Sequence, residues 1–330
     1  MIPNYNHIFG IRLKMAKKQD SGYKYIFGPI PSRRLGLSLG VDMVPHKTCT
    51  LDCVYCECGK TTNLTLTRKE YVPLKRIKAE LEAFLANAPL LDFITFSGAG
   101  EPTLHNGLED IVRFIKTAFP QYKLALLTNG TLFYRSDVSN EIIDLDLVKV
   151  SLDAVYEKNF KRINRPHREL ELSHIINGLI AFRKKFTKQF WIEVFLVPGY
   201  NDSPIELKEI RNVLNILAPD RVQLNTLDRP GTEPWVEPAG KKALTEIAAY
   251  LYNAQIIKHF KPDPNARILD EDFYQRLLAA IKRRPCTADD ASRLLGVDEK
   301  EVRRHLYALI AKGAITKKKM PRGTFYMKRN

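Results

Sequence analysis

The sequence predicts an α/β fold, in which parallel strands and helices form an open barrel, followed by a smaller helical domain. Three observations predict it. Strand and helix patterns alternate along most of the chain, polar side chains recur on one face of several strands, and positive charge concentrates near the C-terminus. A length of 330 residues fits two domains.

Six short apolar segments alternate with longer segments in which apolar residues recur at helical spacing. The predicted strands are residues 38–44, 92–98, 123–130, 147–153, 190–198 and 221–228. The predicted helices are residues 67–86, 107–118, 136–144, 169–186, 204–217 and 239–253. Alternation with short connections indicates a mostly parallel sheet with helices outside it. This pattern alone does not choose between a doubly wound sheet and an incomplete barrel.

Polar residues share one face on three of the predicted strands. They are Thr95 and Ser97, then Lys149, Ser151 and Asp153, and finally Gln223 and Asn225. Helices cover both faces of a doubly wound sheet, so both faces should be apolar. A polar face common to several strands instead favours an open barrel whose interior meets a polar ligand.

Four of the five cysteines lie in ten residues that follow the first strand, CTLDCVYCEC (49–58). Within them Cys49, Cys53 and Cys56 have the spacing C-x3-C-x2-C. A structural disulfide is not expected, because a chain of this length buries a large core without one. Neighbouring thiolates repel one another, so the spacing indicates a soft metal site. We interpret these three cysteines as ligands of an iron–sulfur cube with one open iron; a zinc knuckle or a redox-sensing cluster is the alternative.

The other two cysteines are not expected to be ligands of the cube. Cys58 follows Cys56 after a single residue, and two ligands so close are sterically awkward on one metal. In the zinc alternative Cys58 would complete a four-cysteine site. Cys286 lies far along the chain before a predicted helix and is expected to be a buried thiol.

The cysteine segment resembles the signature of the radical S-adenosylmethionine enzymes, with Tyr55 as the aromatic residue before the last cysteine. In that family three cysteines hold a [4Fe–4S] cluster, and the amino and carboxylate groups of S-adenosylmethionine chelate the fourth iron. The flanking segments GPIPSRRLG and CECGKTT are similar to a subgroup related to the wyosine-base-forming enzymes. The resemblance implies a partial (β/α)6 TIM-like barrel over residues 26–262. Residues 1–25 are expected to form an irregular extension.

A glycine-rich turn, SGAGEPT (97–103), follows the second predicted strand. Ligand groups gather at the C-terminal ends of strands in parallel β/α folds, and glycines let backbone approach a ligand closely. The turn resembles the family's Gly-Gly-Glu motif, but Ala99 separates its two glycines. Gly100 and Glu101 are the best-matched positions, and Glu101 would accept a hydrogen bond from the methionine ammonium. An ordinary turn that opens a helix is the alternative.

Further cofactor contacts implied by the resemblance lie at the ends of later strands. Asn129 in TNG touches the cofactor or is only a turn residue. Ser151 and Asp153 resemble the positions that contact the ribose. Arg165 would bind the methionine carboxylate, with an exposed loop residue as the alternative. Val197 opens a segment that resembles the adenine wall, to which Tyr55 would add a backbone or stacking contact.

The resemblance also implies the chemistry. The reduced cluster donates one electron to the sulfonium, the C5′–S bond breaks, and a 5′-deoxyadenosyl radical abstracts hydrogen from the substrate. The cofactors perform this step, while the protein binds, orients and excludes water and oxygen. No side chain is predicted to act as a nucleophile or an obligatory general base. Asn225 and Arg229, after the sixth strand, are expected to face the substrate. A reducing protein such as a flavodoxin or ferredoxin is the expected electron donor.

The C-terminal domain, predicted to start with a linker at residue 263, carries most of the excess charge. The net charge of the chain is +15, and residues 276–330 hold 15 Lys and Arg against 5 Asp and Glu. Predicted helices at residues 272–283 and 298–312, with Gly296 at a bend between helices and two strands over residues 313–326, resemble a winged helix-turn-helix.

The basic side chains of this domain predict an anionic partner, with nucleic acid first. Those expected to meet phosphates are Arg303, Arg304, Lys317, Lys318 and Lys319. A solvated basic surface, or a domain that recognises a peptide or protein, is the alternative.

The sequence has no run of about 20 apolar residues and no secretory signal, so a cytoplasmic protein without a membrane span is expected. The predicted function is that of an enzyme modifying a macromolecule, with tRNA or another nucleic acid slightly ahead of a peptide. The rival is a DNA-binding regulator whose cluster senses redox state or S-adenosylmethionine.

Overall fold

The structure is a computed structural model that describes residues 23–32, 34–252, 254–257, 273–295 and 297–329. Most of the predicted N-terminal extension and of the predicted linker lies outside these ranges, as does Gly296. Within them, no helix has both the length and the apolar character needed to cross a membrane.

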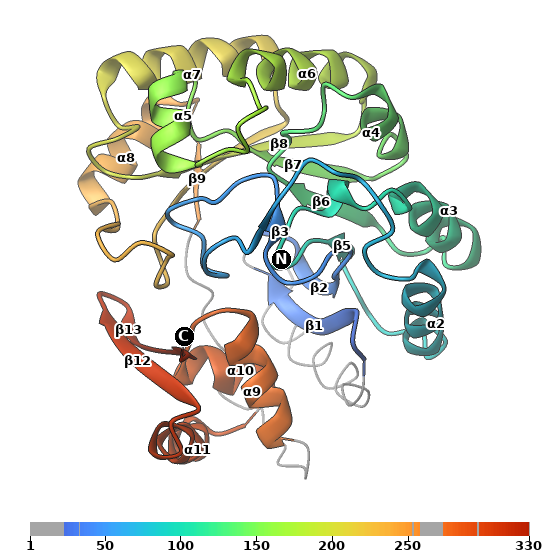
Figure 1. Cartoon of the computed structure of the whole chain (residues 1–330), viewed down its shortest axis with the longest axis vertical. Coiled ribbons are helices and arrows are strands. Elements are labelled where there is room, and N and C mark those ends of the chain that lie inside the picture. The colour runs from blue at the N-terminus through green and yellow to red at the C-terminus, as the bar shows by residue number, and fades with distance from the viewer. Residues whose placement is uncertain (1–22, 33, 253, 258–272, 296, 330) are drawn as a thin grey trace, which may run out of the picture.

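Eight strands form one sheet whose order follows the chain (Figure 1). They are β1 (Ile26–Ser32), β2 (Gly36–Val41), β5 (Phe93–Phe96), β6 (Leu124–Thr128), β7 (Leu147–Ser151), β8 (Gln189–Leu196), β9 (Arg221–Thr226) and β10 (Gln255–Ile256). β1 is antiparallel to β2, and all later neighbours are parallel. A doubly wound sheet changes direction at a switch point. This sheet does not, so its order is that of an incomplete barrel.

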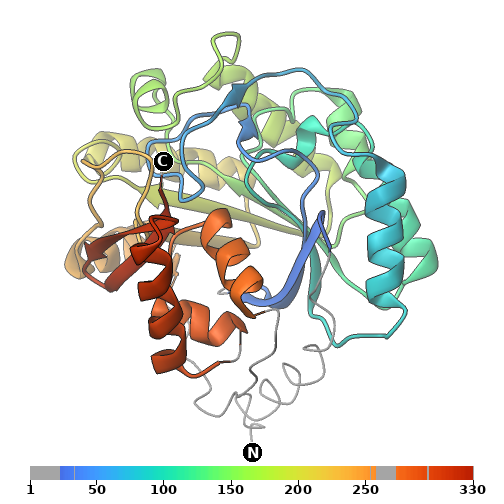
Figure 2. The same ribbon diagram turned by 60° about the horizontal axis from the view of Figure 1, so that its bottom comes forward.

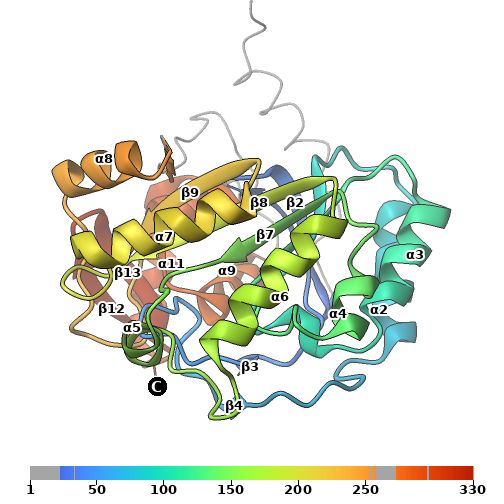
Figure 3. The ribbon, with the colours of Figure 1, turned by 90° about the horizontal axis from the view of Figure 1, so that it is seen from above.

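Helices lie along the outside of the sheet, as the view from above shows (Figure 3). They are α2 (Leu74–Leu85), α3 (Leu108–Ala118), α4 (Ser136–Glu141), α5 (Glu157–Ile163), α6 (Leu172–Lys185), α7 (Pro204–Leu217) and α8 (Lys241–Tyr250). Helix α7 has the predicted bounds, because Ser203 caps its first turn by accepting from the Glu206 N–H at 3.3 Å and Pro204 fits the first helical position.

The alternation predicted all six central strands and six of these helices, and among the strands of this sheet and the helices around it three were missed. β1 contains two prolines, which in the sequence indicate a loop, although prolines are tolerated in an edge strand. β10 has only two residues, and α5 is short and mostly polar. The helix predicted from residue 67 begins at Leu74, because Pro73 ends the extended segment before it.

The two faces of the sheet differ in polarity. On the outer face, Ile94, Val150 and Ile192 belong to one large buried cluster with Ile115 of α3 and Leu179 of α6. The inner face has a small apolar cluster, formed by Leu35, Ala125, Leu147 and Trp191. The polar residues that share this inner face in register are Thr95, Lys149, Ser151, Glu193, Gln223 and Asn225. The inner polar face is therefore present.

Part of this inner polarity serves the protein itself. Lys149 and Glu193 are both buried and their charged groups are 2.9 Å apart, while Arg34 forms a second ion pair with Glu193. Burial raises the pKa of Glu193, but Arg34 and Lys149 outweigh it and hold the pKa at about 2. Lys149 therefore neutralises a neighbour in the barrel interior instead of pointing at a ligand.

A C-terminal unit follows the sheet and has its own core. It consists of α9 (Phe273–Arg283), β11 (Cys286–Thr287), α10 (Ala288–Leu295), α11 (Glu299–Ala311), β12 (Ile315–Met320) and β13 (Gly323–Lys328). Its strands form an antiparallel sheet in the order β11-β13-β12. Leu277, Ile281, Leu306 and the buried thiol Cys286 pack in its core. The unit lies beside β1 and β2 (Figures 1 and 2), where Arg283 forms an ion pair with Asp42.

Candidate cluster and cofactor site

The loop between β2 and α2 carries the cysteines across the end of the barrel and is tied down on two sides. At its start, the Glu101 N–H donates to the Thr48 carbonyl at 3.0 Å, which joins it to the turn after β5. Further on, the Val54 N–H donates to the Ile163 carbonyl at 2.9 Å, which joins it to the end of α5. The cysteine loop is therefore part of the rigid barrel end.

The glycines of the SGAGEPT turn permit the first of these contacts. A Cβ on Gly100 would lie 2.3 Å from the Thr48 carbonyl oxygen. Gly98 has φ +142°, and a Cβ there would lie 1.9 Å from Asp42 Oδ1. Sequence reasoning expected these glycines to approach a ligand. In the structure they let the turn approach the cysteine loop, so their effect on a cofactor is indirect.

Each of the three motif cysteines accepts a hydrogen bond from a different part of the fold. Lys47 Nζ donates to Cys56 Sγ at 3.0 Å, and Asn129 Nδ2 donates to Cys49 Sγ at 3.6 Å. The third donor is the side-chain amide of Asn164, whose nitrogen lies 3.5 Å from the sulfur of the remaining motif cysteine, Cys53. Nitrogen donors around sulfur stabilise thiolates, and hydrogen bonds to sulfur tune iron–sulfur clusters.

The thiols differ in their pKa values because their surroundings differ. Burial raises the pKa of Cys49 to about 12 and raises that of Cys53 further. A hydrogen bond from Cys58, helped by Lys47, lowers the pKa of Cys56 to about 6. In the described residues, no group of three or more His, Cys, Asp or Glu side chains is arranged to hold a single metal ion. A cube places each thiolate on a different iron, and three donor-supported sulfurs on one loop fit that group.

Glu101 lies buried between the cysteine loop and the end of β6. Its Oε1 accepts from the Thr103 N–H at 3.1 Å, the Thr103 hydroxyl at 2.7 Å and the Thr128 hydroxyl at 2.6 Å. Its Oε2 accepts only from the Asn129 N–H, at 2.9 Å, among the described residues. Burial raises the pKa of Glu101, and these donors oppose the rise. Oε2 retains a lone pair that can accept a further hydrogen bond.

Asn129 is more than a turn residue, because its amide joins β6 to the cysteine loop. Nδ2 donates to the Thr50 hydroxyl at 2.8 Å as well as to Cys49. Oδ1 accepts from the Thr131 N–H at 3.0 Å and from its hydroxyl at 2.7 Å. The side chain therefore fixes the position of the first cysteine.

Asp153 and Tyr55 form a second link between the barrel and the cysteine loop. The Tyr55 hydroxyl and Asn164 Nδ2 both donate to Asp153 Oδ2, the latter at 2.8 Å, while Oδ1 accepts from the Phe195 N–H at 2.9 Å. The Tyr55 ring stacks on Phe195 with centroids 3.9 Å apart. Asp153 is thus engaged with protein groups, whereas Ser151 at the end of β7 is partly exposed on the inner face.

The two remaining predicted contacts also have protein partners. Arg165 adopts φ +45° and its guanidinium forms an ion pair with Glu233 at 2.5 Å. The Val197 N–H donates to Asn201 Oδ1 at 2.8 Å. Asn201 is fully buried and its Nδ2 donates to the Asp153 and Phe195 carbonyls, so it ties the ends of β7 and β8 together.

Sequence reasoning missed Lys47, Asn164 and Asn201. Lys47 and Asn164 donate hydrogen bonds to cysteine sulfurs. In the sequence Lys47 lies two positions before Cys49, and Asn164 lies one position before Arg165. Their spacing to the cysteines gave no signal, because both contacts depend on the folded loop. Asn201 follows a Pro-Gly turn in which an Asn is ordinary.

The C-terminal unit packs against the cysteine loop and the end of β9. Arg229 donates to the Pro285 carbonyl at 2.6 Å and to Asp290 at 2.8 Å. Arg322, at the β12–β13 turn, forms 2.8 Å ion pairs with Asp228 and Asp290. Arg229 was expected to face the substrate, but it is buried and holds the C-terminal unit in place.

The apolar part of this contact involves the cysteine loop directly. Met320, just before the β12–β13 turn, packs against a buried cluster that includes Val54, Phe195 and Leu227, with Tyr55 at its edge. The β12–β13 hairpin therefore lies next to the predicted cofactor residues.

The residues predicted to bind nucleic acid lie on the surface of this unit. Arg303 and Arg304 are exposed on α11, but they form ion pairs with Glu299 and Glu301 of the same helix. On β12, Lys317 and Lys319 are exposed and Lys318 is half-buried.

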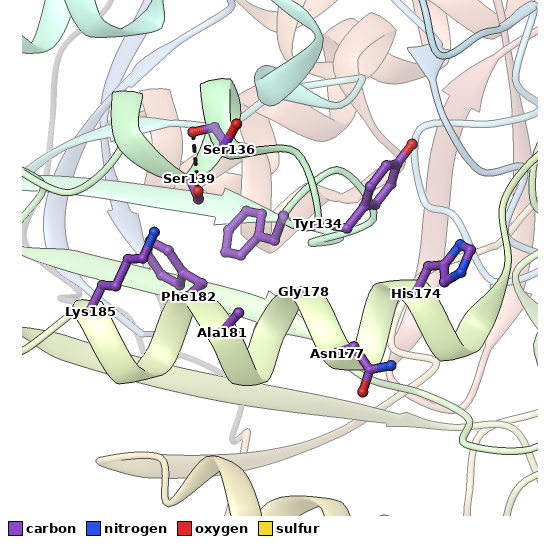
Figure 4. A pocket seen from close by; sticks show the side chains of 10 residues that line it. Tyr134, Ser136, Ser139, His174, Asn177, Gly178, Ala181, Phe182 and Lys185 are labelled. Carbon is purple, nitrogen blue, oxygen red and sulfur yellow. Dashed lines mark hydrogen bonds between the residues drawn. The ribbon is translucent and has the colours of Figure 1, made fainter.

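A groove of about 460 Å³ lies elsewhere, between α6 and the loop and helix α4 on the outer side of the barrel (Figure 4). Tyr134, Gly178 and Phe182 are among its lining residues. Gly178 is required there, because a Cβ would lie 2.4 Å from the Tyr134 nitrogen. None of the predicted site residues lines this groove.

Comparison with known proteins identifies the family. The family model described as Radical SAM superfamily matches residues 43–209, which contain the cysteine motif and strands β5 to β8. The chain is 34% identical to a UPF0026 protein of Methanocaldococcus jannaschii, over 82% of this chain and 85% of that protein. It is also 34% identical to a protein named GTPase Obg of Brachyspira hyodysenteriae over 88% of this chain, but it spans only 43% of that protein.

A solved structure supports the fold. A radical SAM methyltransferase from Sphaerobacter thermophilus superposes with a TM-score of 0.54 at 18% identity, covering 66% of this chain and 64% of that one. The shared fold is α/β with the parallel sheet typical of a radical SAM partial barrel. Enzymes of this superfamily use a [4Fe–4S] cluster and S-adenosylmethionine, and Cys49, Cys53 and Cys56 carry the corresponding cysteine pattern. The chain therefore belongs to the radical SAM superfamily and, by its relatives, to the UPF0026 family.

Proposed function

We propose that this radical SAM enzyme modifies a macromolecule, and that the substrate is a nucleic acid, with tRNA first, ahead of a peptide. One observation carries the proposal. The β12–β13 hairpin packs through Met320 on the cluster that contains Val54 of the cysteine loop, pairs through Arg322 with Asp228 after β9, and exposes Lys317 and Lys319. A polyanion bound along this hairpin would lie beside the site, since lysines attract phosphates without regard to sequence.

We infer that the C-terminal unit is a winged helix-turn-helix. The order of α9, α10 and α11, followed by a hairpin that pairs with β11, supports this assignment. Glu299 and Glu301, which pair with Arg303 and Arg304, offset the positive charge of α11. The lysines of β12 form no such ion pairs with the described residues, so β12 is the stronger candidate for phosphate contacts.

At the site, we assign the cluster to Cys49, Cys53 and Cys56. Bound together, the cluster and S-adenosylmethionine supply a radical that abstracts hydrogen from the substrate. Glu101 presents Oε2 to the methionine ammonium, with Gly100 and Asn129 holding the turn and loop around it. Ser151 offers a hydroxyl to the ribose.

The other residues predicted to contact the cofactor bind protein groups, and most of them act by positioning the cysteine loop and the strand ends. Asp153 and Tyr55 keep the loop in register with β8, so that backbone near Val197 can face the adenine. Arg165 meets the methionine carboxylate only if its ion pair with Glu233 yields. The cytoplasmic location and a flavodoxin or ferredoxin as electron donor stay predictions.

Activity is tested by anaerobic reconstitution with iron, sulfide, S-adenosylmethionine and a strong reductant. Release of 5′-deoxyadenosine is expected from the native chain and not from Cys56→Ala. Tight, sequence-selective duplex binding without any 5′-deoxyadenosine release would contradict the proposal and favour a DNA-binding regulator.

The substrate class is tested by recovering bound nucleic acid and peptide from anaerobically purified protein. Salt-sensitive recovery of RNA is expected, reduced severalfold by Lys317→Gln with Lys319→Gln, because fewer counterions are released on binding. The matched control is Lys241→Gln with Lys242→Gln on the exposed start of α8, which removes equal charge away from the hairpin. Recovery of a peptide would contradict nucleic acid as the substrate, and equal loss in both variants would contradict the hairpin as its binding surface.

A further inference from the structure

Lys47 is a buried lysine in contact with one of the cluster cysteines. Only 3% of its surface is exposed, and its Nζ lies 3.0 Å from Cys56 Sγ. A buried ammonium is strongly unfavourable unless an anion compensates it. Among the described residues no Asp or Glu forms an ion pair with Lys47, and the group that its ammonium contacts is the sulfur of Cys56. The charge of Lys47 is therefore matched to the cysteine loop.

The backbone fixes this lysine in place before any cofactor binds. Lys47 has φ +59°, in the left-handed region that costs energy for a residue with a side chain. Its N–H donates to the Ala99 carbonyl at 2.5 Å, and its own carbonyl accepts from the Thr62 and Asn63 N–H groups, each at 3.1 Å. Bonds on both sides hold the backbone of Lys47 in this conformation, so its side chain starts from a fixed position beside Cys56.

We propose that Lys47 raises the reduction potential of the cluster by holding a fixed positive charge against the Cys56 thiolate. Reduction adds one negative charge to a cube that already bears three thiolates, so a nearby cation stabilises the reduced form more than the oxidised form. Asn129 and Asn164 donate to the other two sulfurs without carrying charge, so their influence is smaller. Lys47 thus makes the electron easier to supply. The inference rests on the assignment of the cluster to these cysteines.

The test is an EPR-monitored anaerobic redox titration of the reconstituted full chain, without S-adenosylmethionine. Lys47→Met keeps the length of the side chain and removes the charge. At a fixed solution potential, the ratio of reduced to oxidised cluster is expected to fall at least tenfold, which is about 59 mV for a one-electron couple. Lys47→Arg restores the charge and should return most of the ratio. The matched control is Lys60→Met, an exposed lysine of the same loop, which should leave the ratio unchanged.

Iron and sulfide content, measured in every variant, separates the possible failures. If the native chain holds no [4Fe–4S] cluster, the proposed function fails. If Lys47→Met holds a full cluster at the native potential, only this inference is overturned. Lys47→Gln, which keeps a donor without charge, is the second variant should Lys47→Met lose the cluster, and the same fall is expected. Loss of the cluster from both variants would assign Lys47 to cluster assembly instead and would also overturn the inference.

Discussion

The position of the cysteine loop depends on single atoms. Gly100 has no side chain, and this lets the turn after β5 bring the Glu101 N–H within 3.0 Å of the Thr48 carbonyl. The same turn aims the Glu101 carboxylate at β6, where Asn129 then reaches Cys49. The absence of a side chain at Gly100 therefore allows the contacts that link Glu101, Asn129 and Cys49.

Gly100→Ala is expected to disrupt cluster binding. Its Cβ would lie 2.3 Å from a backbone oxygen, which cannot rotate away as a side chain can, so the turn and the cysteine loop must separate. We expect lower iron content after anaerobic reconstitution and a loss of about 2 kcal/mol in the free energy of unfolding. Gly240→Ala is the control, because nothing lies within 4 Å of its Cβ and its φ is −66°. Equal iron content in the two variants would show that the turn has room to adjust.

At the scale of the elements, sequence patterns predicted what depends on local periodicity. The six central strands and the exact bounds of α7 follow from apolar spacing, Ser203 and Pro204. β1 was missed, because its two prolines suggest a loop until β2 supplies a partner. The cysteine motif and Glu101 were found at strand ends. Lys47 and Asn164, which donate hydrogen bonds to cysteine sulfurs, were not found from the sequence, because only tertiary contacts bring them close to sulfur.

The inner face of the sheet shows the same limit. Polar periodicity predicted that Lys149 faces inward, but its partner, Glu193, lies on the next strand, and their pairing depends on the register of β7 with β8. The polar pattern suggested that these side chains face a ligand. In the structure Lys149 instead forms a buried ion pair with Glu193, and Arg34 forms a second ion pair with the same carboxylate.

Glu193→Gln is expected to destabilise the protein by about 3 kcal/mol at neutral pH, because it leaves two buried cations without their anion. The pKa of this carboxyl is about 2 in the folded chain, against an ordinary value of 4.5. Its stabilising effect is therefore complete above about pH 4.5 and is lost as the pH falls through about 2. Urea unfolding of the reduced apo-protein at several pH values should show the difference between native chain and variant shrinking over that window.

The control for this experiment is Glu246→Gln, an exposed residue of α8 whose only ion pair among the described residues is with Lys242 at 3.9 Å. It should unfold like the native chain at every pH. A Glu193→Gln difference that stays constant from pH 5 to pH 2 would mean that the carboxylate charge is not what stabilises the interior.

For the whole molecule, the decisive contact is that of the C-terminal unit with the barrel end. Charged groups form this contact. Asp290 of α10 accepts hydrogen bonds from Arg229, which follows β9, and from Arg322 of the β12–β13 hairpin. Arg322 also forms an ion pair with Asp228. These arginines outweigh burial and hold the pKa of Asp290 well below its usual range. Because the same hairpin carries Met320 against the loop, docking and the order of the cysteine loop should be coupled.

Asp290→Asn tests that coupling, since it removes the charge between two arginines without changing the size of the side chain. We expect about 3 kcal/mol less stability for the docked arrangement. Hydrogen exchange should become faster in α10 and in residues 54–58, which Met320 no longer holds. Asp289→Asn is the matched control, because the adjacent carboxylate is partly exposed and pairs with Arg293 inside the same helix. Any change in exchange in this variant is expected within α10, and residues 54–58 should stay unchanged. Faster exchange in α10 alone after Asp290→Asn would show that the cysteine loop keeps its order without the C-terminal unit, and the unit would then act only in binding the substrate.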